Sequence, residues 1–445
     1  MEKRIKINKS ILLATVLFSF NATIFCFLIY PKIDNKINLN FDGEGYQKIA
    51  FNILSNKGFI FDEGDDSVLS SNKRHTLLRT PLYPYFISFV YYIFGFKPNV
   101  VIIFHIIINS FMIYFIYRIA KEVFNEKTAI LSSIICAFYL PFIWLLSRVY
   151  NENLFTFLLI CSMFFVVKVF YNLSLRNSII LGILIGISSL CKGQMIVLPF
   201  VLLPGLIYIY RKEKIKLYKR FSMIIISLLL TISPWTIRNY IVSGKFVPVQ
   251  YGAGIHFMRG NESAKMYFCF SSLSFSDAIH QAFAKEEQAI NRFETLHNRN
   301  ITEVELDEVF KNIAFNNIKD NPLEFLEKIF IGCFHFWYLG ENKIKSLGLA
   351  IVQFPIIILA IFGFYFAYKK KIKIIIPLYS LILFFMLIHA VIQAIFRYSI
   401  PIMPYVLIFA SFGILNLYNK LKCENSDNLV LKLKKETNEK RNIPL

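Results

Sequence analysis

Two carboxylates stand two residues apart in the stretch 39-LNFDGEGYQKIAFNIL-54, just after the first long apolar run of the chain. Asp42 or Glu44 could act as a general base, because a positioned carboxylate can take the proton from an attacking hydroxyl. Either could instead be a solvated residue of a turn. The formal net charge is +20, so cations are abundant in this chain. Which of them lie near these carboxylates decides between the two interpretations.

Other charged residues stand near the ends of later apolar runs: Arg79, Arg148, Glu152, Lys192, Arg238 and Arg397. On the membrane topology that these runs predict, all of them share one face with Asp42 and Glu44. An arginine there can hold a phosphate oxygen by a charge-assisted hydrogen bond. Cations for a phosphate and a carboxylate for a proton are the parts of a transferase whose leaving group is a lipid phosphate.

The composition predicts the elements that must position these side chains. The 445 residues are 56% hydrophobic and only 18% charged, whereas a soluble protein is about 45–50% apolar and about 25% charged. Uncharged runs of roughly 18 residues or more indicate membrane spans. The sequence therefore predicts an all-α polytopic membrane protein.

We expect about ten transmembrane helices, with both termini in the cytoplasm. They are predicted near 10–30, 100–120, 128–147, 153–172, 178–191, 194–210, 221–237, 346–368, 374–394 and 399–418. The connections assigned to the cytoplasm, near 118–127, 168–176, 211–220 and 369–373, are all basic, as the positive-inside rule requires. The first span is expected to be an uncleaved signal anchor rather than a signal peptide.

The positive charge lies between or after the apolar runs, so the expected partner is the lipid bilayer and not nucleic acid. Two regions fall outside the membrane: a first outer loop, 31–99, and a large outer loop, 238–345. Each contains a segment expected to lie in the membrane interface, 79–95 and 321–337. We expect one transmembrane domain over 1–418 and a basic cytoplasmic tail over 419–445.

The middles of the predicted spans contain no Asp, Glu, Lys or Arg. His105, His389 and Gln393 are the notable polar candidates there, and each is interpreted as a packing residue. A secondary transporter usually carries ionisable groups near the midplane. This pattern favours chemistry at one face of the membrane over transport through it.

Four segments carry a resemblance to a known family: FDGEGYQKIAFNIL (41–54), RTPLYPYFISFVYYIFG (79–95), YLPFIWLLSRVYNENLFTFLL (139–159) and FRYSIPIMPYVLIFASFGI (396–414). The sequence resembles the GT-C-type membrane glycosyltransferases, in particular the glycosyltransferase family 39-like group. That group includes protein O-mannosyltransferases and lipid A aminoarabinose transferases. The resemblance runs from about residue 10 to about residue 418. Where the family commonly has Thr-Glu, this chain has Asn151-Glu152.

The resemblance implies roles for particular residues. Asp42 matches the family's first-loop aspartate, the general base, whereas Glu44 falls where the family is variable. Glu152 matches a second acidic position that positions the acceptor or a metal, although it could simply cap a helix. The expected substrate-binding set is Tyr46, Arg79, Tyr83, Glu152, Lys192, Arg238, Arg397 and Tyr398. For Arg79, Lys192 and Arg397, snorkelling to the interface is the alternative to contact with the donor phosphate.

The function implied is transfer of a sugar from a polyprenyl-phosphate-linked donor to an extracytoplasmic acceptor (protein, lipid or glycan), with inversion, at the plasma membrane. The chain lacks a phosphate-cradling Gly-rich turn for a nucleotide sugar. The alternatives are a polysaccharide polymerase or ligase with a lipid diphosphate donor, a lipid-linked sugar flippase, and a non-enzymatic member of the fold. No metal ligand is assigned, and dependence on a divalent cation stays open because Asp42 and Glu152 alone make a poor ligand set.

Overall fold

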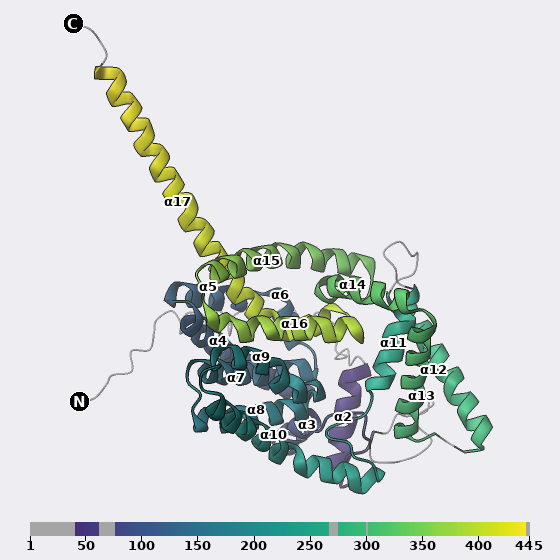
Figure 1. Cartoon of the computed structure of the whole chain (residues 1–445). Coiled ribbons are helices and arrows are strands. Elements are labelled where there is room, and N and C mark those ends of the chain that lie inside the picture. The colour runs from purple at the N-terminus through teal and green to yellow at the C-terminus, as the bar shows by residue number, and fades with distance from the viewer. Residues whose placement is uncertain (1–40, 62–75, 267–274, 300, 442–445) are drawn as a thin grey trace.

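The computed structural model describes residues 41–61, 76–266, 275–299 and 301–441. The regular structure within these ranges is helical, as predicted. The span expected near 10–30 and parts of both outer loops lie outside the described residues. The helices form one body, from which the C-terminal helix projects (Figure 1).

Six helical segments are long and apolar enough to cross a membrane. They are α4 (Pro98–Val123), α7 (Asn151–Tyr171), α10 (Lys214–Ser243), α15 (Lys343–Lys369), η4 (Lys373–Ile375) with α16 (Ile376–Val391), and η5 (Phe396–Ile402) with the first part of α17 (Met403–Arg441). These six correspond to expected spans, so the chain is a multi-pass membrane protein.

The expected span 128–147 is a bent pair, α5 (Glu126–Ala137) and α6 (Leu140–Leu146), with an angle of 51° between the two helices. The backbone at Tyr139 is extended, and Pro141 stands in the first turn of α6. Proline is accommodated at a helix start but cannot continue a helix that began earlier. The pair would count as a seventh span.

The segments 178–191 and 194–210 are also helical, as α8 (Leu175–Cys191) and as η3 (Gly193–Val197) with α9 (Leu198–Ile209). The 17 residues of α8 reach only about 26 Å, less than the ~30 Å hydrocarbon core. The expected count of ten spans is therefore not reached by length and composition over the described residues. The extended backbone of Lys192 separates the two helices.

Small residues allow the helices to pack closely. A Cβ atom on Gly363 of α15 would lie 1.8 Å from the carbonyl oxygen of Phe409 in α17. A Cβ atom on Gly182 of α8 would lie 2.4 Å from the carbonyl oxygen of Ile224 in α10. Close backbone approach of this kind drives helix association within membranes. Helix α7 is buried along most of its length and forms the centre of the bundle.

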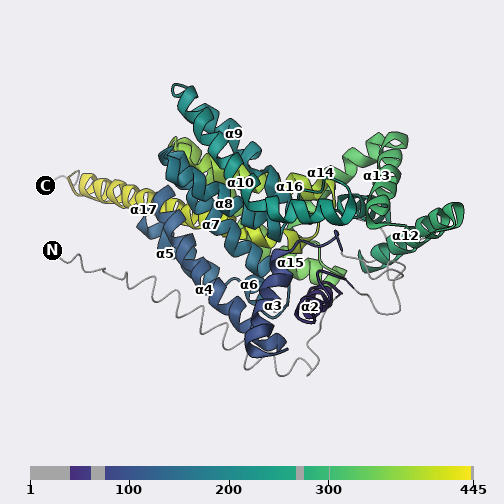
Figure 2. The same ribbon diagram turned by 90° about the horizontal axis from the view of Figure 1, so that it is seen from below.

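The remaining helices gather at one end of the bundle. They are α2 (Phe41–Leu54), α3 (Leu82–Phe94), α11 (Ala253–Met266), α12 (Phe275–His297), α13 (Glu303–Asp320) and α14 (Pro322–Tyr338). Helices α11, α12 and α13 form a group at one side, and α2 lies beside α3 (Figures 1 and 2). An apolar cluster that includes Ile255 and Phe310 joins α11 to α13.

Two features bear on the expected boundaries. Helices α3 and α14, expected in the interface, expose large apolar side chains, among them Tyr92 and Phe330. Helix α17 runs without a break to Arg441, so no helix end marks the expected boundary between the domain and the tail at 418.

Candidate functional site

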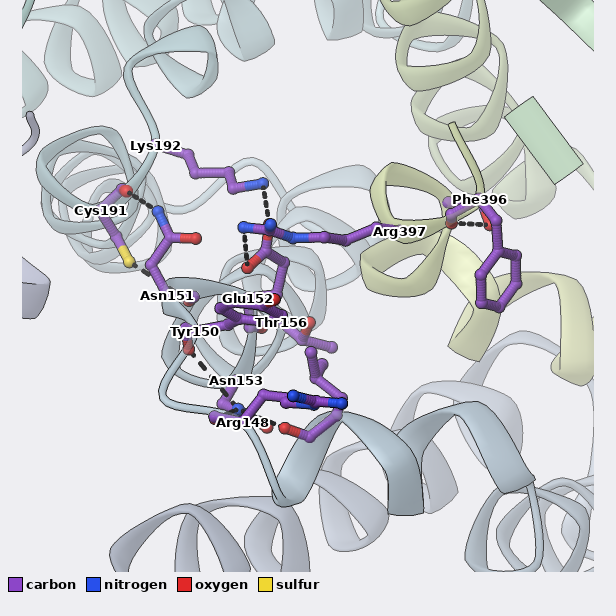
Figure 3. A network of polar contacts seen from close by, with 12 residues as sticks. Arg148, Tyr150, Asn151, Glu152, Asn153, Thr156, Cys191, Lys192, Phe396 and Arg397 are labelled. Carbon is purple, nitrogen blue, oxygen red and sulfur yellow. Dashed lines mark hydrogen bonds and ion pairs between the residues drawn. The ribbon is translucent and has the colours of Figure 1, made fainter. Parts of the chain in front are cut away.

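A buried carboxylate held by two cations forms the centre of the site (Figure 3). Arg397 donates to Glu152 from Nε to Oε1 at 2.9 Å and from Nη2 to Oε2 at 3.1 Å, while Lys192 donates from Nζ to Oε1 at 3.0 Å. The side chain of Glu152 is 1% exposed, and those of Lys192 and Arg397 are 14% and 20% exposed. Both cations therefore keep a small exposed part while Glu152 is fully buried.

Three interruptions of helical structure bring these residues together. Glu152 is the second residue of α7, Lys192 is the extended residue between α8 and η3, and Arg397 is the second residue of η5. The carboxylate oxygens of Glu152 therefore bind cations from two other elements. Its place in the first turn of α7 also suits the helix dipole.

Aromatic rings lie against both cations. The guanidinium carbon of Arg397 lies 4.0 Å from the ring centre of Tyr150. Lys192 Nζ lies 5.2 Å from the ring centre of Tyr398 and 5.4 Å from that of Phe155. A cation is attracted to the face of an aromatic ring, most strongly where water is excluded. The rings therefore hold the two cations in a partly desolvated position.

The turn between α6 and α7 is held by a buried amide. Asn153 Nδ2 donates to the carbonyl oxygens of Leu145 at 2.9 Å and Arg148 at 3.1 Å. Its Oδ1 accepts from Asn109 Nδ2 of α4 at 3.4 Å. This turn includes Tyr150, so Asn153 supports the ring on which Arg397 rests.

The backbone around Lys192 is fixed from two sides. The carbonyl oxygen of Cys191 accepts from Thr80 Oγ1 at 2.8 Å and from Asn151 Nδ2 at 3.4 Å. Thr80 directly follows Arg79 in sequence, so this contact brings the segment carrying Arg79 to the loop carrying Lys192.

Helix α2 lies against the same turn. A Cβ atom on Gly43 would lie 3.3 Å from the carbonyl oxygen of Val149, so the first turn of α2 contacts the turn before Glu152. Asp42 belongs to this first turn, and its side chain lies outside the described part of the structure. Tyr46, one turn later, has the Arg79 guanidinium 5.2 Å from its ring centre.

Tyr83 joins α3 to this arrangement. Its ring packs edge-on against Tyr46, with 5.0 Å between ring centres, and its hydroxyl lies 3.2 Å from His105 Nε2. Burial, with smaller contributions from Tyr46 and Glu152, raises the pKa of the Tyr83 phenol well above its usual range. The hydroxyl is therefore a neutral hydrogen-bonding group.

Two other predicted residues stand apart from the cluster. Arg238 Nη1 donates to the carbonyl oxygen of Thr76 at 3.1 Å, and its guanidinium carbon lies 4.6 Å from a ring centre of Trp235. It therefore holds backbone near Arg79 and does not join the contacts to Glu152. Glu44 is half-exposed and pairs with Lys48 at 3.0 Å, as a solvated residue would.

The prediction missed the half-buried Glu303 and several buried polar residues: Asn109, Asn153, Lys328 and Gln353. Gln353 of α15, fully buried, donates to the hydroxyl of Tyr139, although the middles of the spans were expected to offer only His105, His389 and Gln393. Asparagine and glutamine residues within apolar runs could have indicated such contacts, because a buried amide needs a hydrogen-bond partner.

The side chains that the structure describes offer no set of ligands for a metal ion. The described residues contain no group of three His, Cys, Asp or Glu side chains that could hold one. Glu152 is engaged by two cations, which would repel a divalent ion. We therefore derive no step through a metal.

The comparisons agree with this architecture. The family model described as dolichyl-phosphate-mannose-protein mannosyltransferase matches residues 78–237, which include Glu152 and Lys192. No curated protein matches the chain.

Solved structures share the fold. An oligosaccharyltransferase, AglB, from Archaeoglobus fulgidus, in complex with an inhibitory peptide and a dolichol-phosphate, aligns with a TM-score of 0.57 and 12% identity over 94% of this chain. An apo oligosaccharyltransferase structure from the same organism aligns with a TM-score of 0.60 and 13% identity over 97% of this chain. The chain spans about half of those proteins, 52% and 53% of their lengths.

A structure of ArnT from Cupriavidus metallidurans aligns at 11% identity over 91% of this chain and 77% of that one, with a TM-score of 0.41 that does not define a shared fold. The chain therefore shares the helical fold of the solved oligosaccharyltransferases. Residues 78–237 also match the mannosyltransferase family model.

Proposed function

We propose that this protein transfers a sugar from a polyprenyl-phosphate-linked donor to an extracytoplasmic acceptor, with inversion at the anomeric carbon. The observation that carries the proposal is the buried Glu152 carboxylate with Lys192 and Arg397 bound to it. This cluster brings two cations to the helix start that lies beside α2, the helix that bears Asp42. The printed descriptions of the similar proteins name dolichyl-phosphate-mannose and a dolichol-phosphate, which supports a lipid phosphate donor.

Lys192 and Arg397 are proposed to hold the donor phosphate. Both keep part of their side chain exposed while Glu152 fixes their positions. The phosphate carries about one negative charge as a diester and gains more when the sugar leaves. Fixed cations stabilise such developing charge without reorganising during the reaction. Arg79, linked to the Lys192 loop through Thr80, is proposed as a further cation for the same phosphate.

Asp42 is proposed as the general base. Its carboxylate would take the proton from the acceptor hydroxyl as the acceptor oxygen forms a bond to the anomeric carbon. The bond from that carbon to the phosphate oxygen breaks, and its electron pair stays on the lipid phosphate. The contact of Gly43 with Val149 supports this assignment, because it places the first turn of α2 beside the cation cluster.

The remaining assignments follow from this reaction. We propose that α2, α3 and α11–α14 face the outside of the plasma membrane, that α11–α13 shape the acceptor site, and that residues 1–418 act as one domain followed by a cytoplasmic tail. Tyr46, Tyr83 and Tyr398 would line the donor site, and Arg238 would support it through the backbone.

Two alternatives differ in measurable ways. A polymerase or ligase would use a lipid diphosphate as donor. A flippase would move a lipid-linked sugar and form no new bond. Product analysis with a polyprenyl-monophosphate sugar distinguishes both from the proposed reaction.

Asp42→Asn tests the proposal. The variant should bind the donor as the wild type does and lose sugar transfer, while Arg397→Ala should lose donor binding as well. Wild-type-like turnover by folded Asp42→Asn would remove Asp42 from the role of base. In cells that lack the protein, mass spectrometry should show accumulation of one polyprenyl-phosphate sugar, and an unchanged lipid pool would contradict the donor assignment.

A further inference from the structure

We infer that Glu303, at the start of α13, is a positioning residue for Arg79. Glu303 would hold segment 76–80 in place. It would thereby link the α11–α13 group to Arg79, which lies in that segment. The inference rests on the proposed function only where it assigns Arg79 to the donor phosphate. The contacts of Glu303 with segment 76–80, called the clamp below, do not depend on the proposed function.

Both oxygens of Glu303 are used on this segment. Oε1 accepts from Thr76 Oγ1 at 2.8 Å, and Oε2 accepts from the backbone nitrogen of Leu77 at 2.6 Å. Thr76 Oγ1 in turn accepts from the backbone nitrogen of Leu78 at 3.1 Å. One carboxylate therefore orders two consecutive residues that are more than 220 positions away in sequence.

Other contacts also hold the same residues. The carbonyl oxygen of Leu77 accepts from the backbone nitrogen of Tyr251 at 2.8 Å, and that of Thr76 accepts from Arg238. At the other end of the segment, Thr80 donates to Cys191. Arg79 lies between two anchored ends.

The position of Arg79 depends on this anchoring. Its guanidinium carbon lies 5.2 Å from the ring centre of Tyr46 and 5.8 Å from that of Phe61. A displacement of segment 76–80 would move the guanidinium relative to α2. Glu303 contacts this segment from the first residue of α13. The start of α13 is itself fixed by a capping box of Thr302 and Glu305.

Hydrogen exchange of the purified full-length protein tests the clamp without any substrate. Glu303→Ala should raise the exchange rate of the Leu77 amide at least tenfold, because that amide loses its acceptor. Glu303→Gln should restore most of the protection, since its carbonyl oxygen can still accept. Glu308→Ala, an exposed residue of the same helix, is the matched control and should leave Leu77 unchanged. Unchanged exchange in Glu303→Ala, or an equal rise along the whole of α13, overturns the clamp.

Binding of farnesyl phosphate tests the connection to Arg79. Glu303→Ala should weaken binding about three- to tenfold, and it should add nothing in a protein that already carries Arg79→Ala. A further loss in the Arg79→Ala background would show that Glu303 acts by another route and would overturn the inference. If Arg79→Ala leaves binding unchanged while Leu77 exchange responds to Glu303, the donor role of Arg79 fails and the clamp stands.

Discussion

Arg397 binds both oxygens of Glu152 across 245 positions of sequence, at 2.9 and 3.1 Å. The arginine fork matches the carboxylate in a two-bond geometry that a lysine cannot reproduce. Lys192 adds a third bond to the same carboxylate. A carboxylate so placed orients two cations that would otherwise repel each other.

Glu152→Gln should destabilise the protein strongly. Removing the charge takes the shared carboxylate from two largely buried cations, and breaking such a buried arrangement costs about 3–5 kcal/mol. Thermal unfolding in detergent measures the loss. Glu44→Gln is the control, because its ion pair with Lys48 is half-exposed and such a pair contributes little. Equal stability of the two variants would contradict the assignment of Glu152 as the centre of the cluster.

Asn153→Ala should lower the free energy of unfolding by about 1–3 kcal/mol, because buried carbonyl oxygens lose their donor. The turn before α7 should also loosen, so donor binding through Arg397 should weaken. Chemical denaturation and farnesyl phosphate binding report the two effects. The exposed Asn172, just after α7, provides the control Asn172→Ala. Asn153→Ala behaving like that control would remove the amide from its supporting role.

Gly363→Ala should destabilise the contact between α15 and α17. The added methyl group would meet the Phe409 carbonyl oxygen at 1.8 Å, and overpacking of this kind costs about 1–3 kcal/mol. Gly348 lies in the same helix with nothing within 4 Å of an added Cβ atom. Gly348→Ala should therefore unfold no earlier than the wild type. Comparable melting temperatures for the two variants would argue against this helix contact.

Lys328 should make stability depend on pH. Burial lowers its pKa to about 7, from an ordinary value near 10.4. Between these values the unfolded chain holds a proton that the folded protein lacks, so stability rises with pH over that range. Lys328→Met should flatten this rise in melting temperature between about pH 7 and pH 10. A rise that persists in the variant would assign it to another group.

The elements could be predicted from the sequence because hydropathy is a local property. Every expected span within the described residues coincides with helical structure. The break at Lys192 was predicted, between the spans 178–191 and 194–210, because polar residues interrupt the apolar run there. The bend at Tyr139 was not predicted, because the hydrophobic pattern does not change at that position.

The members of the site could be proposed from sequence, but their contacts could not. Glu152, Lys192 and Arg397 were each singled out as charges near helix ends. That one carboxylate binds both cations depends on how α7, α8 and η5 pack. Glu303 and Asn153 act on backbone groups, and such partners leave no mark in the sequence because every residue carries the same backbone.

The contacts to Glu152 also imply an order of assembly during synthesis. Lys192 follows Glu152 by 40 residues, so the ribosome supplies this cation soon after the carboxylate. Arg397 follows by 245 residues, after most of the bundle has been made. For a long stretch of translation, therefore, Glu152 of the newly inserted α7 can pair with Lys192 but not yet with Arg397. Closure by Arg397 comes late, and a nascent chain halted before η5 would contain an incomplete site.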